Sequence, residues 1–192
     1  MNYVSITRKL DLNQLKGRLS KMTIGSIIAG CRTERELTQK QLSLDINCSP
    51  DMVSKLENGK RKLQKDMMPH ISSEIDHVRL TTALWGEVTG GVTIPYLDGD
   101  YIDHSPAALV MRALREMDEA EKHLEQVDAT KPVDYMSREE ADLIAKANRE
   151  LLDVAAMAIT LVGDNCEWFG LSFADEIKSW KVTLKARRFI QK

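Results

Sequence analysis

The chain has 192 residues, of which 43% are hydrophobic and 29% charged, so it can form one large domain or two small ones. No apolar run reaches the roughly 18 residues of a membrane-spanning helix, and residues 1–22 lack the apolar core of a signal peptide. The net charge of −2 conceals a basic first part, with 14 Lys and Arg against 9 Asp and Glu in residues 1–80, and an acidic remainder, with 13 against 20.

Residues 1–22 form a basic extension with leucines at partial helical spacing. Three interpretations stay open. The segment is a short helix, an arm that touches the DNA backbone or minor groove, or sequence upstream of a true start at Met22.

The next segment predicts a short helix followed by a tight turn. Thr38 is a residue type that caps helix N-termini, and Leu42 and Ile46 lie one helical turn apart on its apolar face. Asn47 follows where the chain must turn, and Asn tolerates the left-handed conformation better than any residue except Gly.

A second helix follows directly. Ser49 and Pro50 are an N-cap and a first-turn proline, Val53 and Leu56 share its inner face, and Gly59 ends it. Two helices joined by a short turn are a helix-turn-helix, whose second helix can enter the DNA major groove.

The residues themselves resemble a family. LTQKQLSLDINCSPDMVSKLENGK, residues 37–60, is similar to the helix-turn-helix of the XRE/Cro-CI family, which includes the lambdoid phage repressors. The resemblance covers about residues 23–84 and implies a five-helix lambda-repressor-like domain that binds double-stranded DNA. The chain departs from the family pattern at Asn47, Pro50 and Asp51, which bears on the target sequence more than on the fold.

Contacts to the DNA backbone need helix N-termini and flexible basic side chains. Gln39 opens the first helix of the motif, and the resemblance implies that Gln39 and Asn58 bind phosphates. We expect Lys60 and Arg61, with Lys62, to do the same, although they would otherwise be ordinary solvated charges.

Base contacts should come from the outer face of the second helix. Lys55 can donate to guanine, Asp51 can accept from cytosine N4, and Met52 can contact a thymine methyl. Asp51 has an alternative role, because an acidic residue in a first turn is favoured by the helix dipole. The predicted set is Pro50, Asp51, Met52, Ser54 and Lys55.

Two further predictions concern structure. Glu57 lies beside the inward Leu56, where a carboxylate must be paired, and the resemblance implies Arg32 as its partner in a structural ion pair. Cys31 and Cys48 fall on apolar positions and are interpreted as core residues of a protein in a reducing cytoplasm.

Signals for metal, cofactor or catalysis are weak. Asp98, Asp100, Asp103 and His104 invite a metal interpretation, but their order does not match an EF-hand and a polar loop explains them. The four histidines are scattered, and no nucleophile or phosphate-loop motif is present. We expect no metal, no cofactor and no enzymatic activity.

The organisation predicted is all-α in two parts. After the extension 1–22 come a DNA-binding domain over 23–85, a linker over 86–104 rich in Gly and Pro, and a helical domain over 105–192. Its three helices should begin at Ser105, Ser137 and Ser172, and the apolar segment 151–162 should be a buried central helix. At most one short strand is expected, near residues 92–96.

The function expected is that of a sequence-specific transcriptional regulator at the nucleoid, a prokaryotic or phage repressor. A homodimer on a palindromic operator doubles the few base contacts of one module, and the C-terminal helices are the natural place for that contact. One alternative is an antitoxin-type protein whose C-terminal helices bind a protein partner while the first domain autoregulates. The other is a helix-turn-helix kept only for protein contact.

Overall fold

The computed structural model describes residues 23–191, so the expectations for residues 1–22 lie outside it. Its described part is all-helical, as predicted, and contains no strand at residues 92–96 or elsewhere between 23 and 191. None of these helices is long and apolar enough to cross a membrane. The elements are α2 (Ile24–Glu34), α3 (Gln39–Asp45), α4 (Pro50–Glu57), α5 (Met68–Ile75), α6 (Val78–Thr89), α7 (Pro106–Leu124), the 3-10 helix η1 (Val133–Tyr135), α8 (Arg138–Phe169) and α9 (Phe173–Ala186).

The helix-turn-helix forms where the sequence predicts it. Thr38 caps α3 and joins Gln41 in a reciprocal capping box, and Ser49 caps α4 ahead of Pro50. Between them Asn47 has φ 53°, and Gly59 has φ 66° after α4. The boundaries of both helices thus follow from local residue chemistry.

Helices α2 to α6 enclose one hydrophobic core. Side chains from all five helices are buried in it, and Cys31 is fully buried while Cys48 packs at its edge, as predicted. Helix α2 crosses very close to the end of α4 at Gly25, where a Cβ would lie 2.2 Å from the carbonyl oxygen of Leu56. Glycine at this position therefore sets the distance between α2 and α4.

Helix α6 continues past residue 85, where we placed the end of the first domain, and ends at Gly90 with φ 69°. The Gly- and Pro-rich segment that follows is anchored on α8. The backbone N–H of Leu97 donates to Thr160, and the Tyr96 hydroxyl donates to Asp164 at 2.7 Å. His104 Nδ1 also lies 2.7 Å from Asp164, so His104 pairs with a carboxylate.

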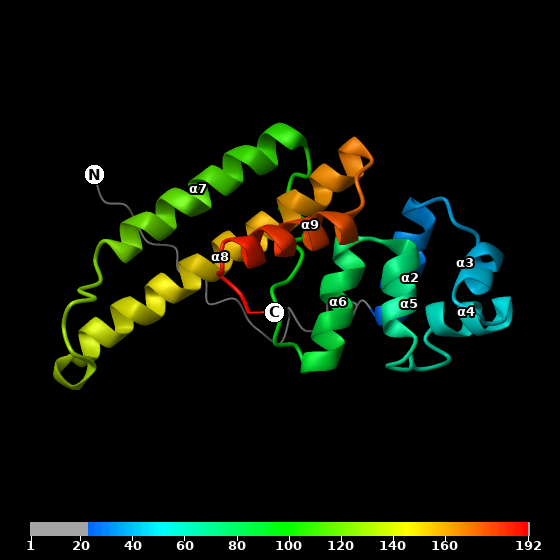
Figure 1. Ribbon diagram of the computed structural model, residues 1–192, viewed down its shortest axis with the longest axis horizontal. Coiled ribbons are helices and arrows are strands. Elements are labelled where there is room, and N and C mark those ends of the chain that lie inside the picture. The colour runs from blue at the N-terminus through cyan, green and yellow to red at the C-terminus, as the bar shows by residue number, and fades with distance from the viewer. Residues whose placement is uncertain (1–22, 192) are drawn as a thin grey trace.

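The C-terminal part is an antiparallel hairpin of α7 and α8 with α9 folded back along α8 (Figure 1). The three helices begin after Ser105, Ser137 and Ser172, and Ser137 forms the expected capping box with Glu140. Figure 1 shows α2 to α5 at one end of the molecule and the α7–α8 turn at the other, with α6 between them.

The prediction of a buried helix over residues 151–162 is wrong in part. These residues lie in the middle of α8, and Ala156, Met157 and Thr160 are buried. However, Leu151 is 42% exposed and Val162 40%, because α7 and α9 pack on two sides of α8 and leave the strip between them open.

Candidate nucleic-acid interface

The outer face of α4 presents three of the five residues predicted to contact bases. Pro50, Asp51 and Lys55 are exposed, while Ser54 is half-buried. Met52 is also half-buried and packs against the hydrophobic core, so less of it is available to a thymine methyl. The motif therefore offers a small polar surface at the start of α4.

Two of these residues pair with each other. Lys55 Nζ lies 2.7 Å from Asp51 Oδ2, one helical turn away, and both side chains are at least half exposed. An exposed pair of this kind is weak, so DNA can compete for either member. Lys55 can contact guanine only when the ammonium turns away from Asp51 or bridges the two.

Gln39 and Asn58 are arranged differently from the simple expectation of free phosphate donors. The Gln39 amide donates inward to Glu57 Oε2 at 2.7 Å, and Asn58 Nδ2 donates to the backbone oxygen of Ser54 at 2.8 Å. Both side chains are thus oriented by the scaffold. Phosphate binding through them is still a prediction.

The expected ion pair between Arg32 and Glu57 is present and is bidentate. Arg32 Nε donates to Glu57 Oε1 at 2.6 Å and Nη2 donates to Oε2 at 3.0 Å, while Nη1 donates to the backbone oxygen of Leu37. The carboxylate is almost fully buried and also accepts the Gln39 bond. One buried network therefore fixes α2, the start of α3 and the end of α4.

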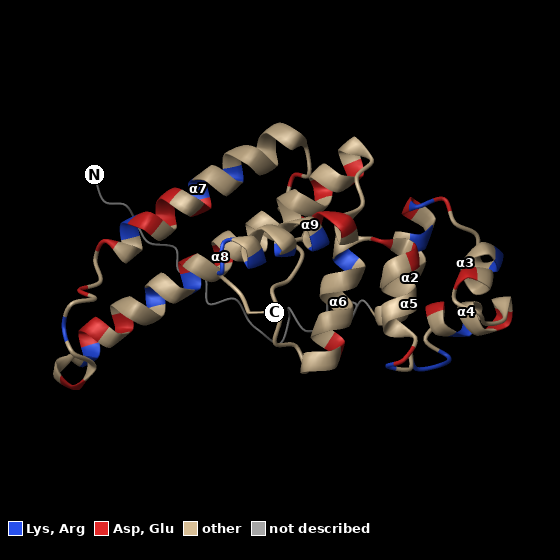
Figure 2. Cartoon of the chain, viewed as in Figure 1, with Lys and Arg blue, Asp and Glu red and all other residues tan. Residues whose placement is uncertain are grey.

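A basic strip follows α4. Lys60, Arg61 and Lys62 are all exposed, and the backbone N–H groups of Lys60 and Arg61 both donate to the carbonyl of Lys55, which folds the strip back against the helix end. Figure 2 shows these basic residues on the loop after α4, whereas acidic residues gather on the second half of α7. The exposure of the strip permits the phosphate contacts predicted for Lys60, Arg61 and Lys62, which stay a prediction.

Comparison with known families identifies this part of the chain. Residues 28–75, which run from α2 to the end of α5, match the family model HTH_3, described as Helix-turn-helix. The chain carries an XRE-type helix-turn-helix domain. Domains of this family occur in DNA-binding regulators. Searches of curated proteins and of solved structures each found no match.

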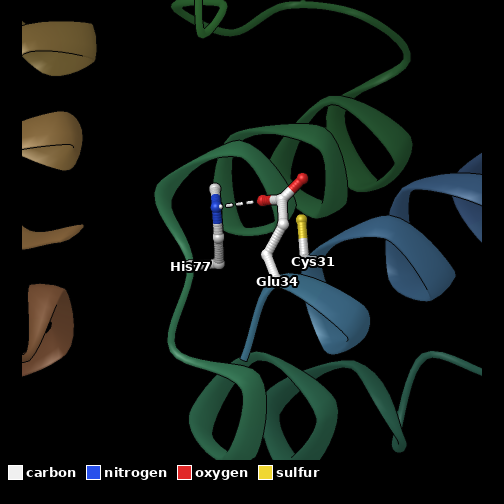
Figure 3. Close-up of side chains that lie close together, drawn as sticks. All are labelled: Cys31, Glu34 and His77. Carbon is white, nitrogen blue, oxygen red and sulfur yellow. Dashed lines mark ion pairs between the residues drawn. The ribbon is translucent and has the colours of Figure 1, made fainter. Parts of the chain in front are cut away.

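The helix-turn-helix domain contains a second polar cluster, which the sequence did not reveal. Cys31, Glu34 and His77 each bring one potential metal ligand within 4.8 Å of the others, and His77 Nε2 lies 2.9 Å from Glu34 Oε2 (Figure 3). Only Glu34 and Cys31 are close in sequence. His77 reaches them because it caps α6.

The hydrogen bonds of this cluster suit an arginine better than a metal ion. His77 Nδ1 accepts the N–H of Arg79, so the proton of a neutral ring is on Nε2, the atom that faces Glu34. Arg79 Nη2 donates to Glu34 at 2.6 Å and lies 3.5 Å from Cys31 Sγ. Burial raises the pKa of the Cys31 thiol, which keeps it protonated. We interpret the cluster as structural.

Beside it, charged groups connect the helix-turn-helix domain to the C-terminal helices. Arg35 donates to the backbone of Ile75 and Asp76 and pairs with Glu167 of α8 at 2.8 Å. Asp76 in turn accepts the N–H of Ala174, one of the free N–H groups in the first turn of α9, at 2.8 Å. Burial raises the pKa of the Glu167 carboxyl, and Arg35 partly offsets that effect.

Proposed function

We propose that this chain is a sequence-specific transcriptional regulator, a prokaryotic or phage repressor that binds a palindromic operator as a homodimer at the nucleoid. The observation that carries the proposal is the combination of an exposed α4 face with a basic strip at its C-terminal end. The exposed α4 face would contact bases, and the basic strip would contact phosphates.

Rigid support favours this use of α4. The carboxylate of Glu57 is bound by Arg32 and Gln39 just behind the outer face, so α4 is held against α2 and α3 without using its exposed residues. A recognition helix that is already held in place loses little conformational entropy when it enters the DNA major groove. The proposal needs the dimer because one module of this size makes few base contacts.

Selection of bound sites from random double-stranded DNA tests the proposal. We expect a two-fold symmetric consensus, and we expect Lys55→Ala to relax the base preference at one position in each half-site. Lys60→Ala should weaken binding to all sequences about equally. The slope of log affinity against log salt concentration should fall by the amount expected for about one phosphate contact.

Lys146→Ala is the matched control, because Lys146 is an exposed lysine on α8 away from the motif. It should leave affinity and salt dependence unchanged. Equal, weak binding of wild-type protein to every sequence would refute a sequence-specific regulator, and a consensus without symmetry would refute the palindromic operator.

A further inference from the structure

Helix α8 carries an apolar stripe that the described part of the chain leaves open. Leu151, Val162 and Phe169 are 42%, 40% and 72% exposed, although they lie on a helix that packs against α6, α7 and α9. Two grooves run along the stripe. Leu151 lines one of about 330 Å³ shared with α7, and Ala155, Ala158 and Val162 line one of about 480 Å³ shared with α9. A contiguous exposed apolar surface of this kind marks an interaction site.

The stripe has the spacing of a coiled-coil seam. Its positions alternate at three and four residues along α8, as the a and d positions of a heptad do. The middle of the seam is made of alanines, which permit close approach of another helix. The positions are Leu151, Ala155, Ala158 and Val162, extended by Asn148 and Asn165 at the two ends.

The seam is also symmetric under reversal. When it is inverted about the midpoint between Ala155 and Ala158, Leu151 exchanges with Val162 and Asn148 exchanges with Asn165. Apolar positions therefore meet apolar ones, and amide meets amide. In a parallel pair each position meets its own copy whatever the sequence, whereas in an antiparallel pair like residues meet only if the seam has this symmetry.

The two amides are suited to bond one another. Among residues 23–191, neither the Asn148 nor the Asn165 side chain takes part in a hydrogen bond. An asparagine in an otherwise apolar seam costs stability unless it meets a matching polar group, and such pairs fix the register of coiled coils. Antiparallel pairing would provide that group at both ends of the seam.

Helix α7 extends the same surface. Val110, Leu114 and Met117 are 45%, 57% and 49% exposed on one side of the helix, and Met117 lines the groove that also contains Leu151. The α7–α8 hairpin thus presents apolar side chains of both helices on one side. Two such hairpins that face each other bury them in a four-helix bundle.

We propose that two copies of this chain associate through α8, antiparallel, about a two-fold axis between Ala155 and Ala158. Leu151 then packs on Val162 of the partner subunit, and Asn148 bonds to Asn165 of the partner subunit. The inference rests on the proposed homodimer and specifies its surface and its register.

Disulfide cross-linking tests the register. The double variant Asn148→Cys, Asn165→Cys is made in a Cys48→Ser background, because the other native cysteines, Cys31 and Cys166, are buried. The new cysteines are 17 residues apart on one helix, about 25 Å, so they cannot bridge within a chain. We expect a covalent dimer on mild oxidation of the double variant and none with Asn148→Cys alone.

Substitution of the seam tests the surface. Leu151→Arg buries an unpaired charge twice in the symmetric dimer, and we expect the dimer dissociation constant to rise about 100-fold or more in sedimentation or light scattering. Leu152→Arg is the matched control. Leu152 is the neighbouring residue, 54% exposed, and about 100° around the helix, so the shift should stay below about 5-fold.

The outcomes separate this inference from the proposed function. A monomer at all concentrations, or a cross-link from Asn148→Cys alone, which parallel pairing would give, overturns the α8 arrangement even if DNA is bound specifically. A cross-linked dimer that binds all DNA equally supports the arrangement and refutes the regulator. Loss of dimer in Leu152→Arg to the same extent as in Leu151→Arg would also overturn the seam.

Discussion

Gly163 of α8 lies directly against Val78, the first residue of α6. A Cβ at position 163 would fall 2.0 Å from Cγ1 of Val78, a distance that real Cβ contacts do not reach. Val78 is fully buried between α6 and the C-terminal helices, where Cys166 and Phe173 share its cluster. The helix-turn-helix domain and the hairpin are therefore in tight contact here, through a residue without a side chain.

Gly163→Ala should destabilise the protein by about 1–3 kcal/mol, because α6 and α8 must separate to admit the methyl group. The measurement is the free energy of unfolding in urea. Val78→Ala in the same chain removes both methyl groups that the new Cβ would meet but keeps the Val78 Cβ at 2.6 Å, so the double variant relieves the clash in part and should lose less than the sum of the single variants. Additive losses would contradict direct contact as the cause.

Gly25→Ala should destabilise the protein more than the same substitution at Gly30, the other glycine of α2. A Cβ at Gly25 would lie 2.2 Å from the carbonyl oxygen of Leu56 and 2.9 Å from that of Glu57, and backbone cannot rotate away as a side chain can. We expect a loss of about 3 kcal/mol and weaker DNA binding, since α4 is displaced. Thermal unfolding and a DNA titration measure the two effects.

Gly30 provides the matched control within the same helix. A Cβ there would meet only the end of the flexible Arg79 side chain, at 3.1 Å. Alanine favours the helix over glycine by about 1 kcal/mol, so Gly30→Ala should be neutral or slightly stabilising. A similar loss of stability in both variants would show that the close approach of α2 to α4 at Gly25 is not the reason.

The ion pair behind α4 should contribute to stability mainly through the cost of breaking it. Arg32→Met leaves the buried Glu57 carboxylate with only the Gln39 amide, and we expect a loss of about 3–5 kcal/mol. Adding Glu57→Gln should recover part of that loss, because no charge is then buried unpaired. Lys55→Ala, which breaks the exposed pair with Asp51, should change stability by less than about 0.5 kcal/mol.

The sequence predicts those parts of the fold that neighbouring residues decide. The caps at Thr38, Ser49 and Ser137 follow from residue types a few positions apart, and so does the turn at Asn47. The pairing of Arg32 with Glu57 was accessible only through the family resemblance. Within the candidate site, the exposed face of α4 was predictable, but the inward bond of Gln39 was not.

Long-range packing explains what could not be predicted. Periodicity places Leu151 and Val162 on the apolar face of a helix, but it does not tell whether other parts of the chain cover that face. In the structure, both side chains stay exposed. The anchoring of Tyr96 and His104 on Asp164 joins residues more than 55 positions apart, without a motif that signals it. The same is true of His77, which reaches Glu34 and Cys31 only once α6 packs against α2.

His77 should make stability depend on pH. Burial lowers the pKa of His77 below its ordinary value of 6.5, and Glu34 only partly offsets that effect while Arg79 and Arg35 add to it. The folded state therefore holds the ring neutral, and only a neutral ring can accept the N–H of Arg79 at the α6 cap. Neutral His77 therefore stabilises the fold fully at pH values above the pKa of the ring in the unfolded chain, about 6.5. This stabilisation is lost as the pH falls from there toward the lower pKa of the ring in the folded state.

Replacing His77 with asparagine keeps an N-cap acceptor but removes the titration. Between about pH 7 and pH 5, the free energy of unfolding should therefore fall less in His77→Asn than in the wild-type protein. His70→Asn is the control, because His70 is exposed on α5 and should leave the pH dependence unchanged. Parallel curves for wild type and His77→Asn would show that folding does not lower the pKa of His77.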